Sequence, residues 1–468
     1  MLFPTVNFGI FFILVFAAAW LLVRHHRWRL ILLTSVSYVF YAFWDWRFCF
    51  LLLFSSVVNW YFGELIYKSE GKARQNLVAG AVTVDLVVLG FFKYYNFFLS
   101  SLNATLEHLG ARHDIPYLDI VLPVGISFFT FHAISYVVDI YRKKLDRPAP
   151  LLHMLLYISF FPQLVAGPIV RASHFLPQLE HPVDPDDIRA TRAYLLILGG
   201  MFKKVVVSSF LATSVVEPVF FDPGSFGARD LLLAVYGYAL QIYCDFSAYT
   251  DIAIGVAALL GYRFPENFDQ PYRAIGFRDF WRRWHISLSS WLRDYLYIPL
   301  GGNTGDWRRY KNLMITMLLG GLWHGAAWNF AIWGGIHGGL LVAEHRFLGE
   351  HWTESAKSWV KVLGTVITFQ LVCLTWIFFR AVDLPHALSF IGGFSRVSAA
   401  STLATPFTLI LISVLLAAQF LPTDRMAILE RYAIRMPPIA QGAVAGALMI
   451  AIFSIGPSGI APFIYFQF

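Results

Sequence analysis

The sequence predicts an all-α protein that crosses a membrane many times. Hydrophobic residues make up 57% of the 468-residue chain and charged residues only 14%, whereas a soluble globular protein carries roughly 25% charged residues. Apolar stretches recur almost to the C-terminus and correspond to roughly 10 to 13 spanning or re-entrant helices, since a span needs about 20 mostly apolar residues. We therefore expect residues 1–468 to form a single membrane-embedded domain. The clearest stretches are Phe8–Val23, Leu30–Phe43, Asn76–Phe92, Asp230–Leu260 and Val360–Phe379.

The first apolar stretch is predicted to be an uncleaved helix rather than a signal peptide. No basic residue precedes it, and Arg24, Arg27 and Arg29 follow it. Because Lys and Arg are enriched in cytoplasmic loops, this order places the N-terminus outside the cytoplasm. The stretch Arg263–Lys311 holds nine Lys and Arg residues and is expected in the cytoplasm by the same rule. Anionic lipid head groups explain much of this charge, and we do not expect nucleic acid binding.

The three cysteines, Cys49, Cys244 and Cys373, lie far apart in apolar stretches. The sequence shows no Cys-x-x-Cys motif and no Cys/His cluster around them. We therefore predict free, buried thiols that form neither a disulfide nor a metal site.

Helix-breaking residues interrupt an apolar segment in the middle of the chain. Residues 157–171 contain Pro162, Gly167 and Pro168. Broken backbone inside a membrane has to be covered by protein or line a water-filled cavity. A re-entrant segment is the expected structure.

Two carboxylates, Asp245 and Asp251, interrupt the apolar stretch Tyr243–Gly261. Carboxylates within a membrane are costly and tend to face a bundle interior or a cavity. Two interpretations stay open, namely a structural ion pair with an arginine of the following segment and a contact with substrate.

The region Gly276–Tyr295 is predicted to be one amphipathic helix. Aromatic and leucine side chains recur every three or four positions along one face, and the other face carries Arg278, Arg282, His285 and Ser289. A basic helix with aromatic anchors commonly lies in the membrane interface, which accounts for the arginines. His285 borders the aromatic face and can therefore point toward the bundle.

The segment Leu318–Leu341 contains no Asp, Glu, Lys or Arg, so its ionisable groups are His324 and His337. They are separated by about 220° around a helix, so one helix would not turn both toward one site. Such a histidine can be a hydrogen-bonded packing residue or, because apolar surroundings favour the neutral imidazole, a general base. The adjacent Gly325 would let a ligand approach His324 closely. Glycine pairs with small-xxx-small spacing favour close helix packing; they are Gly321/Gly325, Gly334/Gly338 and Gly335/Gly339.

Two long motifs in this part of the chain resemble the membrane-bound O-acyltransferase (MBOAT) family, and in particular its bacterial branch for alginate and exopolysaccharide O-acetylation. They are FRDFWRRWHISLSSWLRDYLYIPLGG (277–302) and LLGGLWHGAAWNFAIWGGIHG (318–338). Supporting stretches are LPVGISFFTFHAISYVVDIYR (122–142), FFPQLVAGPIVR (160–171) and YCDFSAYTDIAIG (243–255). The resemblance covers residues 120 to 340 and is weaker outside them.

The resemblance implies a ring of tilted helices around a thinned centre, with a tunnel joining the two membrane faces. His324 would be the catalytic histidine, and His285 would orient the acyl group or stabilise the developing oxyanion. A catalytic core would occupy residues 120–345, flanked by helices in 1–119 and 346–468. Neither a metal nor a permanently bound cofactor is expected. Further residues expected to bind substrate are Trp323, Trp284, Arg282, Asp245, Ser289 and Gln163.

The function implied is O-acetylation of an exopolysaccharide such as alginate or cellulose at the bacterial inner membrane. The donor would be acetyl-CoA or an acyl-carrier thioester entering from the cytoplasm. A periplasmic acetyltransferase or acetyl-carrying protein would be the partner. One alternative is transfer of D-alanine or another acyl group from a carrier protein to a cell-envelope polymer. Another is a polysaccharide or acyl-group transporter, although transporters often show paired broken helices in both halves, whereas here the breaks fall mainly in the middle.

Overall fold

A computed structural model describes residues 3–110, 115–397, 400–422, 424–457 and 462–464. Every regular element in these ranges is helical, which confirms the predicted all-α class. Within them, six helices are long and apolar enough to span a membrane, or seven if one bent pair is a single span. The chain is thus a multi-pass membrane protein. The six are fewer than the spans predicted because several apolar stretches break into shorter helices. They are Phe48–Lys68, Gly71–His108, Ala190–Phe221, Ala228–Leu259, Ser358–Arg380 and Pro438–Ile455.

The chain divides into two compact units. Unit 1 comprises residues 1–189 and 256–265, and unit 2 comprises residues 190–255 and 266–468. The single domain with a core at 120–345, the ring and the tunnel stay predictions.

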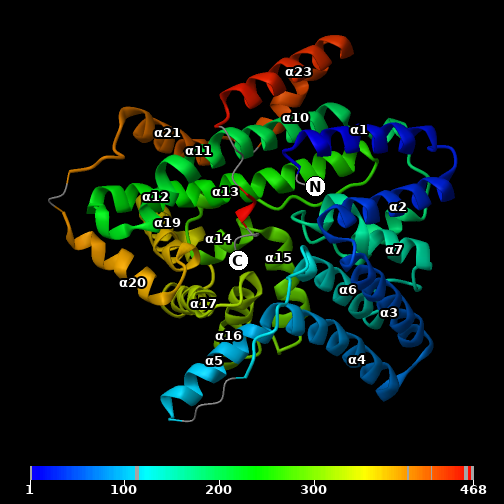
Figure 1. Ribbon diagram of the computed structural model, residues 1–468, viewed down its shortest axis with the longest axis horizontal. Coiled ribbons are helices and arrows are strands. Elements are labelled where there is room, and N and C mark those ends of the chain that lie inside the picture. The colour runs from blue at the N-terminus through cyan, green and yellow to red at the C-terminus, as the bar shows by residue number, and fades with distance from the viewer. Residues whose placement is uncertain (1–2, 111–114, 398–399, 423, 458–461, 465–468) are drawn as a thin grey trace. The chain divides into compact units, whose positions relative to one another are not determined.

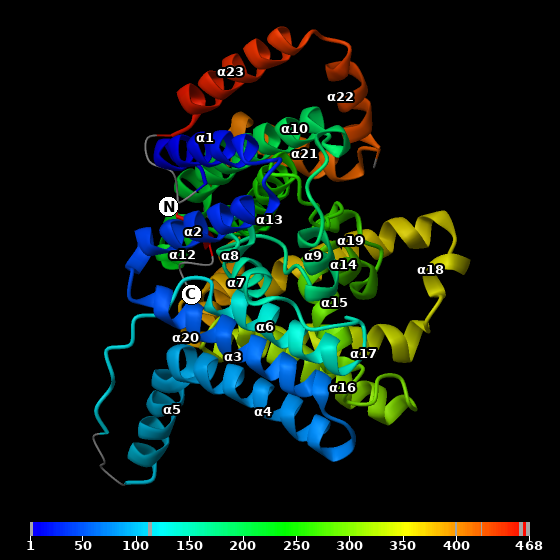
Figure 2. The same cartoon turned by 90° about the vertical axis from the view of Figure 1, so that its right-hand side faces the viewer.

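Unit 1 contains α1 to α9, and Figure 2 shows α3, α4 and α6 packed side by side. The bounds are α1 Val6–Leu21, α2 His26–Asp45, α3 Phe48–Lys68, α4 Gly71–Leu89, α5 Tyr95–His108, α6 Ile126–Tyr141, α7 Leu151–Ser159, α8 Phe161–Leu164 and α9 Ala172–Phe175. A π-helical turn, Gly90–Tyr94, joins α4 to α5, and 3-10 turns lie at Leu176–Leu179 and Pro185–Asp187. A Cβ at Gly63 of α3 would lie 2.6 Å from the hydroxyl of Tyr136 on α6, so this glycine allows the close packing.

Arg29 stabilises unit 1 from within instead of facing lipid head groups. Its side chain is buried and donates hydrogen bonds to the carbonyl oxygen of Ala19 at 3.2 Å, to that of Leu260 at 2.5 Å and to the hydroxyl of Tyr262 at 3.2 Å. A buried guanidinium needs such partners. Lipid head groups therefore do not account for this one of the three basic residues that follow the first apolar stretch.

The predicted break in the segment 157–171 is present. α7 ends at Ser159, α8 is one short turn, and residues 166–170 are buried and lie outside any helix. Protein groups satisfy the exposed backbone, since Gln163 Nε2 donates to the carbonyl oxygen of Tyr157 at 2.6 Å and the Tyr157 hydroxyl donates to that of Val170 at 2.9 Å. This is the protein cover that broken backbone in a membrane requires.

Unit 2 contains α10 to α23 (Figure 1). The bounds are α10 Ala190–Met201, α11 Ser209–Leu211, α12 Glu217–Phe221, α13 Ala228–Leu259, α14 Phe277–Arg283, α15 Ile286–Leu292, α16 Asp306–His324, α17 Trp328–Leu348, α18 Trp352–Ser355, α19 Ser358–Arg380, α20 Leu384–Gly392, α21 Pro406–Ala417, α22 Arg425–Ile434 and α23 Pro438–Ile455. π-Helical turns at Phe202–Ser208 and Ala212–Val216 join α10, α11 and α12 into one span. The last turn of α13 is counted with unit 1.

The aspartates of α13 pair with lysines, not with the arginine expected from the following segment. Lys203 Nζ lies 2.6 Å from Asp251 Oδ2, and Lys204 Nζ lies 2.5 Å from Asp245 Oδ1. Both lysines belong to the π-helical turn after α10. A Cβ at Gly200 would lie 2.8 Å from the carbonyl oxygen of Ala248, so α10 and α13 cross closely enough for these short pairs.

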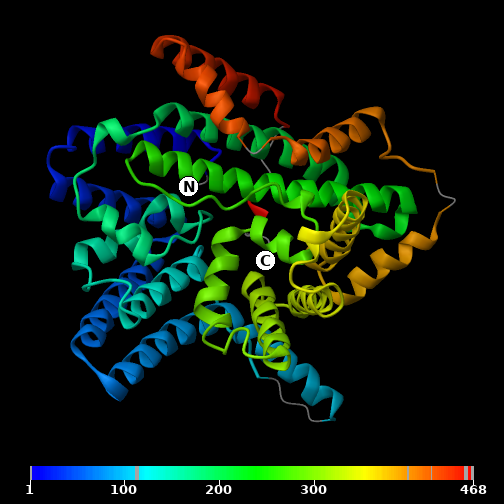
Figure 3. The ribbon, with the colours of Figure 1, turned by 180° about the vertical axis from the view of Figure 1, so that it is seen from behind.

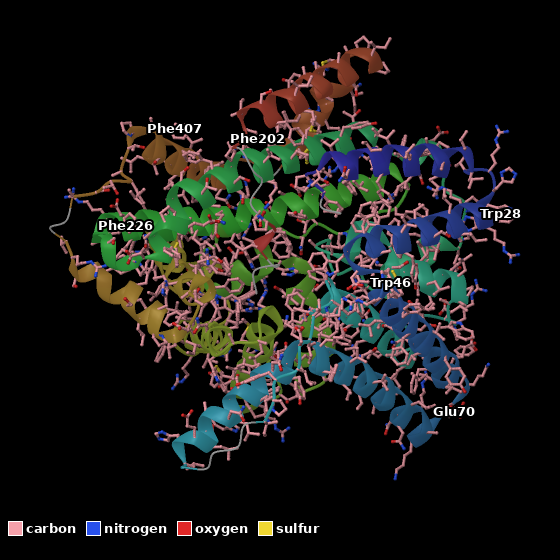
Figure 4. The ribbon with its side chains drawn as sticks, in the orientation of Figure 1. Trp28, Trp46, Glu70, Phe202, Phe226 and Phe407 are labelled. Atoms are coloured by element: carbon pink, nitrogen blue, oxygen red, sulfur yellow. The ribbon has the colours of Figure 1, made fainter. Side chains whose placement is uncertain are left out.

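Large apolar side chains cover the exposed surface of both units. Figure 4 labels Trp28, Trp46, Phe202 and Phe407, whose side chains are between 47% and 65% exposed. Exposed apolar surface on this scale suits a lipid-facing protein. Cys244 and Cys373 are buried as predicted, whereas Cys49 is only partly buried.

Candidate active site

His324 is positioned by a tight hairpin of α16 and α17, the yellow-green pair in Figure 3. α16 ends at His324, and the chain reverses within a few residues to begin α17. A Cβ at Gly321 would lie 2.1 Å from the carbonyl oxygen of Phe330, and one at Gly334 would lie 2.2 Å from that of Met317. The two backbones therefore touch, which is the packing that small-xxx-small spacing allows.

Residues 318–341 therefore form two helices and not one, so the separation of about 220° around a single helix does not apply to His324 and His337. Gly325 is extended, with φ −158° and ψ 150°, and ends α16. A Cβ on it would lie 2.1 Å from the ring of Phe330. The space beside this glycine is filled by Phe330 and is not open to a ligand, as had been expected.

Aromatic rings from three helices surround the His324 imidazole. Its ring centroid lies 5.1 Å from that of Trp323, 5.2 Å from that of Trp333 and 5.3 Å from that of Phe379. The side chain is 4% exposed. The imidazole is therefore enclosed by apolar rings.

His285 lies beside the same tryptophan. Its ring centroid is 6.0 Å from that of Trp323 and 4.6 Å from that of Phe246 on α13. The residue is fully buried. The structure thus brings the two predicted catalytic histidines together around Trp323, although they come from different elements.

The predicted continuous helix over Gly276–Tyr295 breaks at His285. This residue has φ 45° and ψ 54°, a left-handed conformation that separates α14 from α15. Such backbone strain costs about 1–3 kcal/mol and is often found at functional sites. The break also means that Arg278, Arg282, His285 and Ser289 do not share one helical face.

Asn267 holds this strained turn with its backbone and its side chain. Its carbonyl oxygen accepts from the Ile286 backbone N–H at 2.9 Å. Its Oδ1 accepts from the Ser287 backbone N–H at 3.0 Å and from the Ser287 hydroxyl at 2.9 Å, and it lies 3.2 Å from His285 Nδ1. Burial lowers the pKa of His285 to about 3, so its imidazole is neutral at physiological pH.

His337 is nearer to this site than expected, because the hairpin turns α17 back along α16. Its ring centroid lies 4.6 Å from that of Trp333, which also contacts His324. His337 Nε2 is 2.9 Å from the hydroxyl of Thr375, which itself donates to the carbonyl oxygen of Val372 at 2.7 Å. That hydroxyl must accept from His337, which suits a packing role for this histidine.

A cavity of about 490 Å³ lies within unit 2, between α14, α15, α16 and α17. Trp281 lines it and also contacts Trp333, with ring centroids 5.8 Å apart, so an aromatic layer separates the cavity from His324. The cavity wall includes four arginines and several polar side chains. Its charged and polar residues are Arg278, Arg282, Arg293, Arg309, His345, Glu344, Glu350, Ser289, Ser290, Tyr297, Asn303 and Thr316.

Arg282 is the least restrained arginine of this wall. Arg278 and Arg309 both reach Glu350, at 3.0 Å and 3.3 Å, and hold the pKa of its carboxyl below its ordinary value. Arg282 is exposed and makes no ion pair within the described part of the chain. Arg283 faces elsewhere and pairs with Asp279 and Asp269 at 2.8 Å each. The guanidinium most available to an anion is therefore that of Arg282.

The remaining predicted substrate-binding residues lie in different surroundings. Ser289 lines the cavity and donates to the carbonyl oxygen of Trp284 at 3.2 Å. Trp284 is buried and stacks on Phe280. Asp245 is engaged by Lys204, which favours the structural interpretation of this carboxylate. Gln163 belongs to unit 1, where its amide supports the broken segment.

Two features of the site had no signal in the sequence. Asn267 lies in a loop without periodicity. The segment Pro462–Ile464 packs against α13 (Figure 1), with Ile464 N donating to Asp245 Oδ2 at 2.8 Å. The ring of Phe463 lies 4.1 Å from that of Tyr249 and 5.9 Å from that of Phe246.

Among the described residues no group of three or more His, Cys, Asp and Glu side chains is arranged to hold a metal ion.

Comparison with known proteins supports the motif resemblance. A model of the membrane-bound O-acyltransferase family matches residues 86–359. The chain is 41% identical to the probable alginate O-acetylase of Azotobacter vinelandii over 368 residues, which cover 77% of this chain and 71% of that protein. It is 37% identical to the peptidoglycan O-acetyltransferase of Helicobacter pylori, with 77% and 72% covered. Identity to the teichoic acid D-alanyltransferase of Bacillus subtilis is 29%, with 69% and 82% covered.

These matches decide between the branches and the classes considered above. Identity to the alginate O-acetylase exceeds that to the D-alanyltransferase, which confirms the predicted alginate O-acetylation branch. The family and these relatives identify the chain as an enzyme that transfers acyl groups to hydroxyls, and not as the transporter considered as an alternative. The chain belongs to the membrane-bound O-acyltransferase family.

Proposed function

We propose that the protein transfers acetyl groups from a cytoplasmic thioester across the inner membrane for O-acetylation of an extracellular polysaccharide such as alginate. The observation that carries this proposal is the pair of buried histidines, His285 and His324, around Trp323. They stand at the motif positions by which the chain resembles its family. The names of the relatives, alginate O-acetylase and peptidoglycan O-acetyltransferase, support an acetyl group and a cell-envelope polymer.

The reaction is an acyl transfer with His324 as general base. His324 takes the proton of the acceptor hydroxyl as its oxygen attacks the thioester carbonyl carbon. A C–O bond forms, the C–S bond breaks, and the proton on His324 passes to the departing thiolate. General base catalysis of this kind contributes typically 10²–10⁴-fold. The aromatic rings around His324 exclude water, which would otherwise hydrolyse the thioester.

The arginine-lined cavity is the proposed binding site for the phosphates of the donor. Acetyl-CoA and a phosphopantetheine carrier both bear phosphate, and guanidinium groups bind it well. Arg282 is the free cation of the described wall, and the cavity volume of about 490 Å³ suits part of a cofactor-sized ligand.

The side of the membrane that holds the acceptor is proposed from the distribution of basic residues and from the names of the relatives. The basic stretch Arg263–Lys311 supports a cytoplasmic donor side and an N-terminus in the periplasm. The acceptor is then a polysaccharide hydroxyl, reached directly or through a periplasmic acetyltransferase or acetyl-carrying protein.

The test uses purified protein in lipid nanodiscs with radiolabelled acetyl-CoA and an unacetylated polymannuronate acceptor, with and without the periplasmic partner. Transfer by the wild type and at least a hundredfold loss in His324→Ala are expected. Full acetylation by a normally inserted His324→Ala variant would refute His324 as the base.

A second candidate is D-alanyl transfer from a carrier protein, because the chain is also similar to a teichoic acid D-alanyltransferase. D-Alanyl carrier protein, offered in the same nanodiscs in place of acetyl-CoA, separates the two. Transfer from the carrier alone would select this second function.

A further inference from the structure

The hydrogen bonds around Asn267 determine which nitrogen of His285 carries the proton. The backbone N–H of Ser287 can only donate, and it lies 3.0 Å from the Asn267 side-chain atom assigned as Oδ1. That atom must therefore be the oxygen and not the amide nitrogen, because two donors would repel each other. The amide orientation, which is often ambiguous, is settled here by a backbone donor.

The same oxygen faces His285 Nδ1 at 3.2 Å. An amide oxygen can only accept, so Nδ1 must carry the hydrogen. In a neutral imidazole the other nitrogen, Nε2, then has a lone pair and no hydrogen. The residue is fully buried, and Nε2 meets no protein hydrogen-bond partner in the described ranges.

An unpartnered polar atom in a buried site is destabilising, and it points to a ligand that completes it. The His285 ring contacts the rings of Phe246, Phe268 and Trp323, none of which titrates. Trp323 also borders His324. A group of the substrate bound beside this indole would lie next to the His285 imidazole.

We propose that Asn267 is a positioning residue that holds His285 in the Nδ1–H tautomer, so that its bare Nε2 accepts a hydrogen bond from a hydroxyl of the acceptor sugar that neighbours the reacting one. This rests on the proposed acyl transfer. It replaces the oxyanion-stabilising role expected for His285, because a nitrogen without hydrogen cannot donate to an oxyanion. His285 orients the acceptor through this neighbouring hydroxyl, and His324 removes the proton of the reacting hydroxyl.

The first experiment reads the tautomer directly. Protein labelled with ¹⁵N-histidine in nanodiscs is examined by solid-state NMR, with His285 assigned from its loss in His285→Gln. The expected spectrum has a protonated Nδ1 and a bare Nε2 between pH 5 and 8. A protonated Nε2 in the wild type would overturn the proposal regardless of any variant.

The second experiment compares Asn267→Ala with two controls. Asn267→Ala should lose the fixed tautomer and lower kcat by about 10²-fold. This loss lies between the effect of removing a hydrogen-bond partner from a metal-binding histidine and the effect of a wrong histidine tautomer in a serine protease. Ser287→Ala removes one hydrogen bond to the same Oδ1 but keeps the one to His285, so it should keep the tautomer and kcat within about twofold. Equal kcat and equal tautomers in both alanine variants would contradict the proposal.

Asn267→Asp separates positioning from folding. Its carboxylate keeps an acceptor at Nδ1, so kcat at high pH should recover to within about tenfold of wild type. The added negative charge favours the imidazolium, so the acidic limb of the pH–rate profile should move to higher pH. An unchanged profile would count against the proposal. If the wild type transferred no acyl group at all, the proposed function would fail, whereas the NMR result would still decide the tautomer.

Discussion

At the scale of single residues, the site depends on Trp323 because both histidines contact it. The indole is 4% exposed, and its ring centroid lies 6.0 Å from that of His285 and 5.1 Å from that of His324. Loss of this ring would leave space between the two imidazoles. Their relative position therefore depends on packing as much as on hydrogen bonds.

Trp323→Ala should destabilise the protein by about 3–5 kcal/mol and lower kcat more than it raises KM. The matched control is Trp307→Ala on the same helix, where the indole is 80% exposed. Each of the two variants is compared with the wild type by thermal unfolding in nanodiscs and by its rate of acetyl transfer. A loss of stability as large in Trp307→Ala would show that burial is not the cause.

Protonation of His285 should couple stability to pH. Burial lowers its pKa to about 3 in the folded state, whereas the unfolded chain has a pKa near 6.5. Between these values the unfolded state binds the extra proton, so stability is full above pH 6.5 and falls as the pH drops. His285→Gln should remove one proton, about 1.4 kcal/mol per pH unit, from the slope of unfolding free energy between pH 6 and 4. An identical slope in wild type and variant would exclude this coupling.

At the scale of elements, the α16–α17 hairpin places His324, and α14 presents the donor-side arginines. Glu344 of α17 caps α14, accepting from the backbone N–H of Phe277 at 2.6 Å and of Arg278 at 3.2 Å. A Cβ at Gly276 would lie 2.5 Å from this carboxylate. The hairpin thus orients both the histidine and the helix that carries Arg282.

Gly321→Ala should separate the hairpin, since its Cβ would lie 2.1 Å from the Phe330 carbonyl oxygen. Overpacking of this kind costs about 1–3 kcal/mol. Gly339→Ala is the control, because a Cβ there meets nothing within 4 Å, and alanine favours the helix by about 0.5–1 kcal/mol. Unfolding midpoints and kcat should fall in the first variant and hold in the second. The reverse order would contradict the close backbone contact.

Arg282→Glu should raise KM for acetyl-CoA about tenfold or more and leave kcat nearly unchanged, because it removes binding without touching the reacting atoms. Arg308→Glu carries the same charge change at an exposed position of α16 that does not line the cavity. The KM for acetyl-CoA of Arg282→Glu is divided by that of Arg308→Glu, at low and at high salt. A ratio above one reports a contact between Arg282 and the donor and not a general effect of charge. Equal KM values would mean that net charge alone attracts the donor.

At the scale of the whole molecule, the segment Pro462–Ile464 returns to the core of unit 2. Phe463 is buried and contacts Phe246, which in turn contacts His285. The carbonyl oxygen of Pro462 accepts from Lys204 at 3.2 Å. This segment therefore supports the site from α13.

Phe463→Ala should lower stability by about 3–5 kcal/mol and reduce acetyl transfer, because it unpacks Phe246 from beneath His285. Phe453→Ala on α23 is the control, since that ring is 42% exposed. Activity per inserted molecule is measured for both. Full activity and stability in Phe463→Ala would show that this segment does not support the site.

Composition and periodicity determined the class and the membrane location, because apolar length and charge are local properties of the chain. The catalytic roles of His324 and His285 came from the motif resemblance and stay predictions. The breaks at His285 and Gly325 could not be predicted, since an αL residue and a contact between Gly321 and Phe330 depend on atoms distant in sequence. Asn267 next to His285, the lysine partners of the aspartates and the packing of Phe463 on α13 were likewise decided by tertiary structure. Only the folded chain brings together groups separated by 18 or 219 residues to satisfy buried polar atoms.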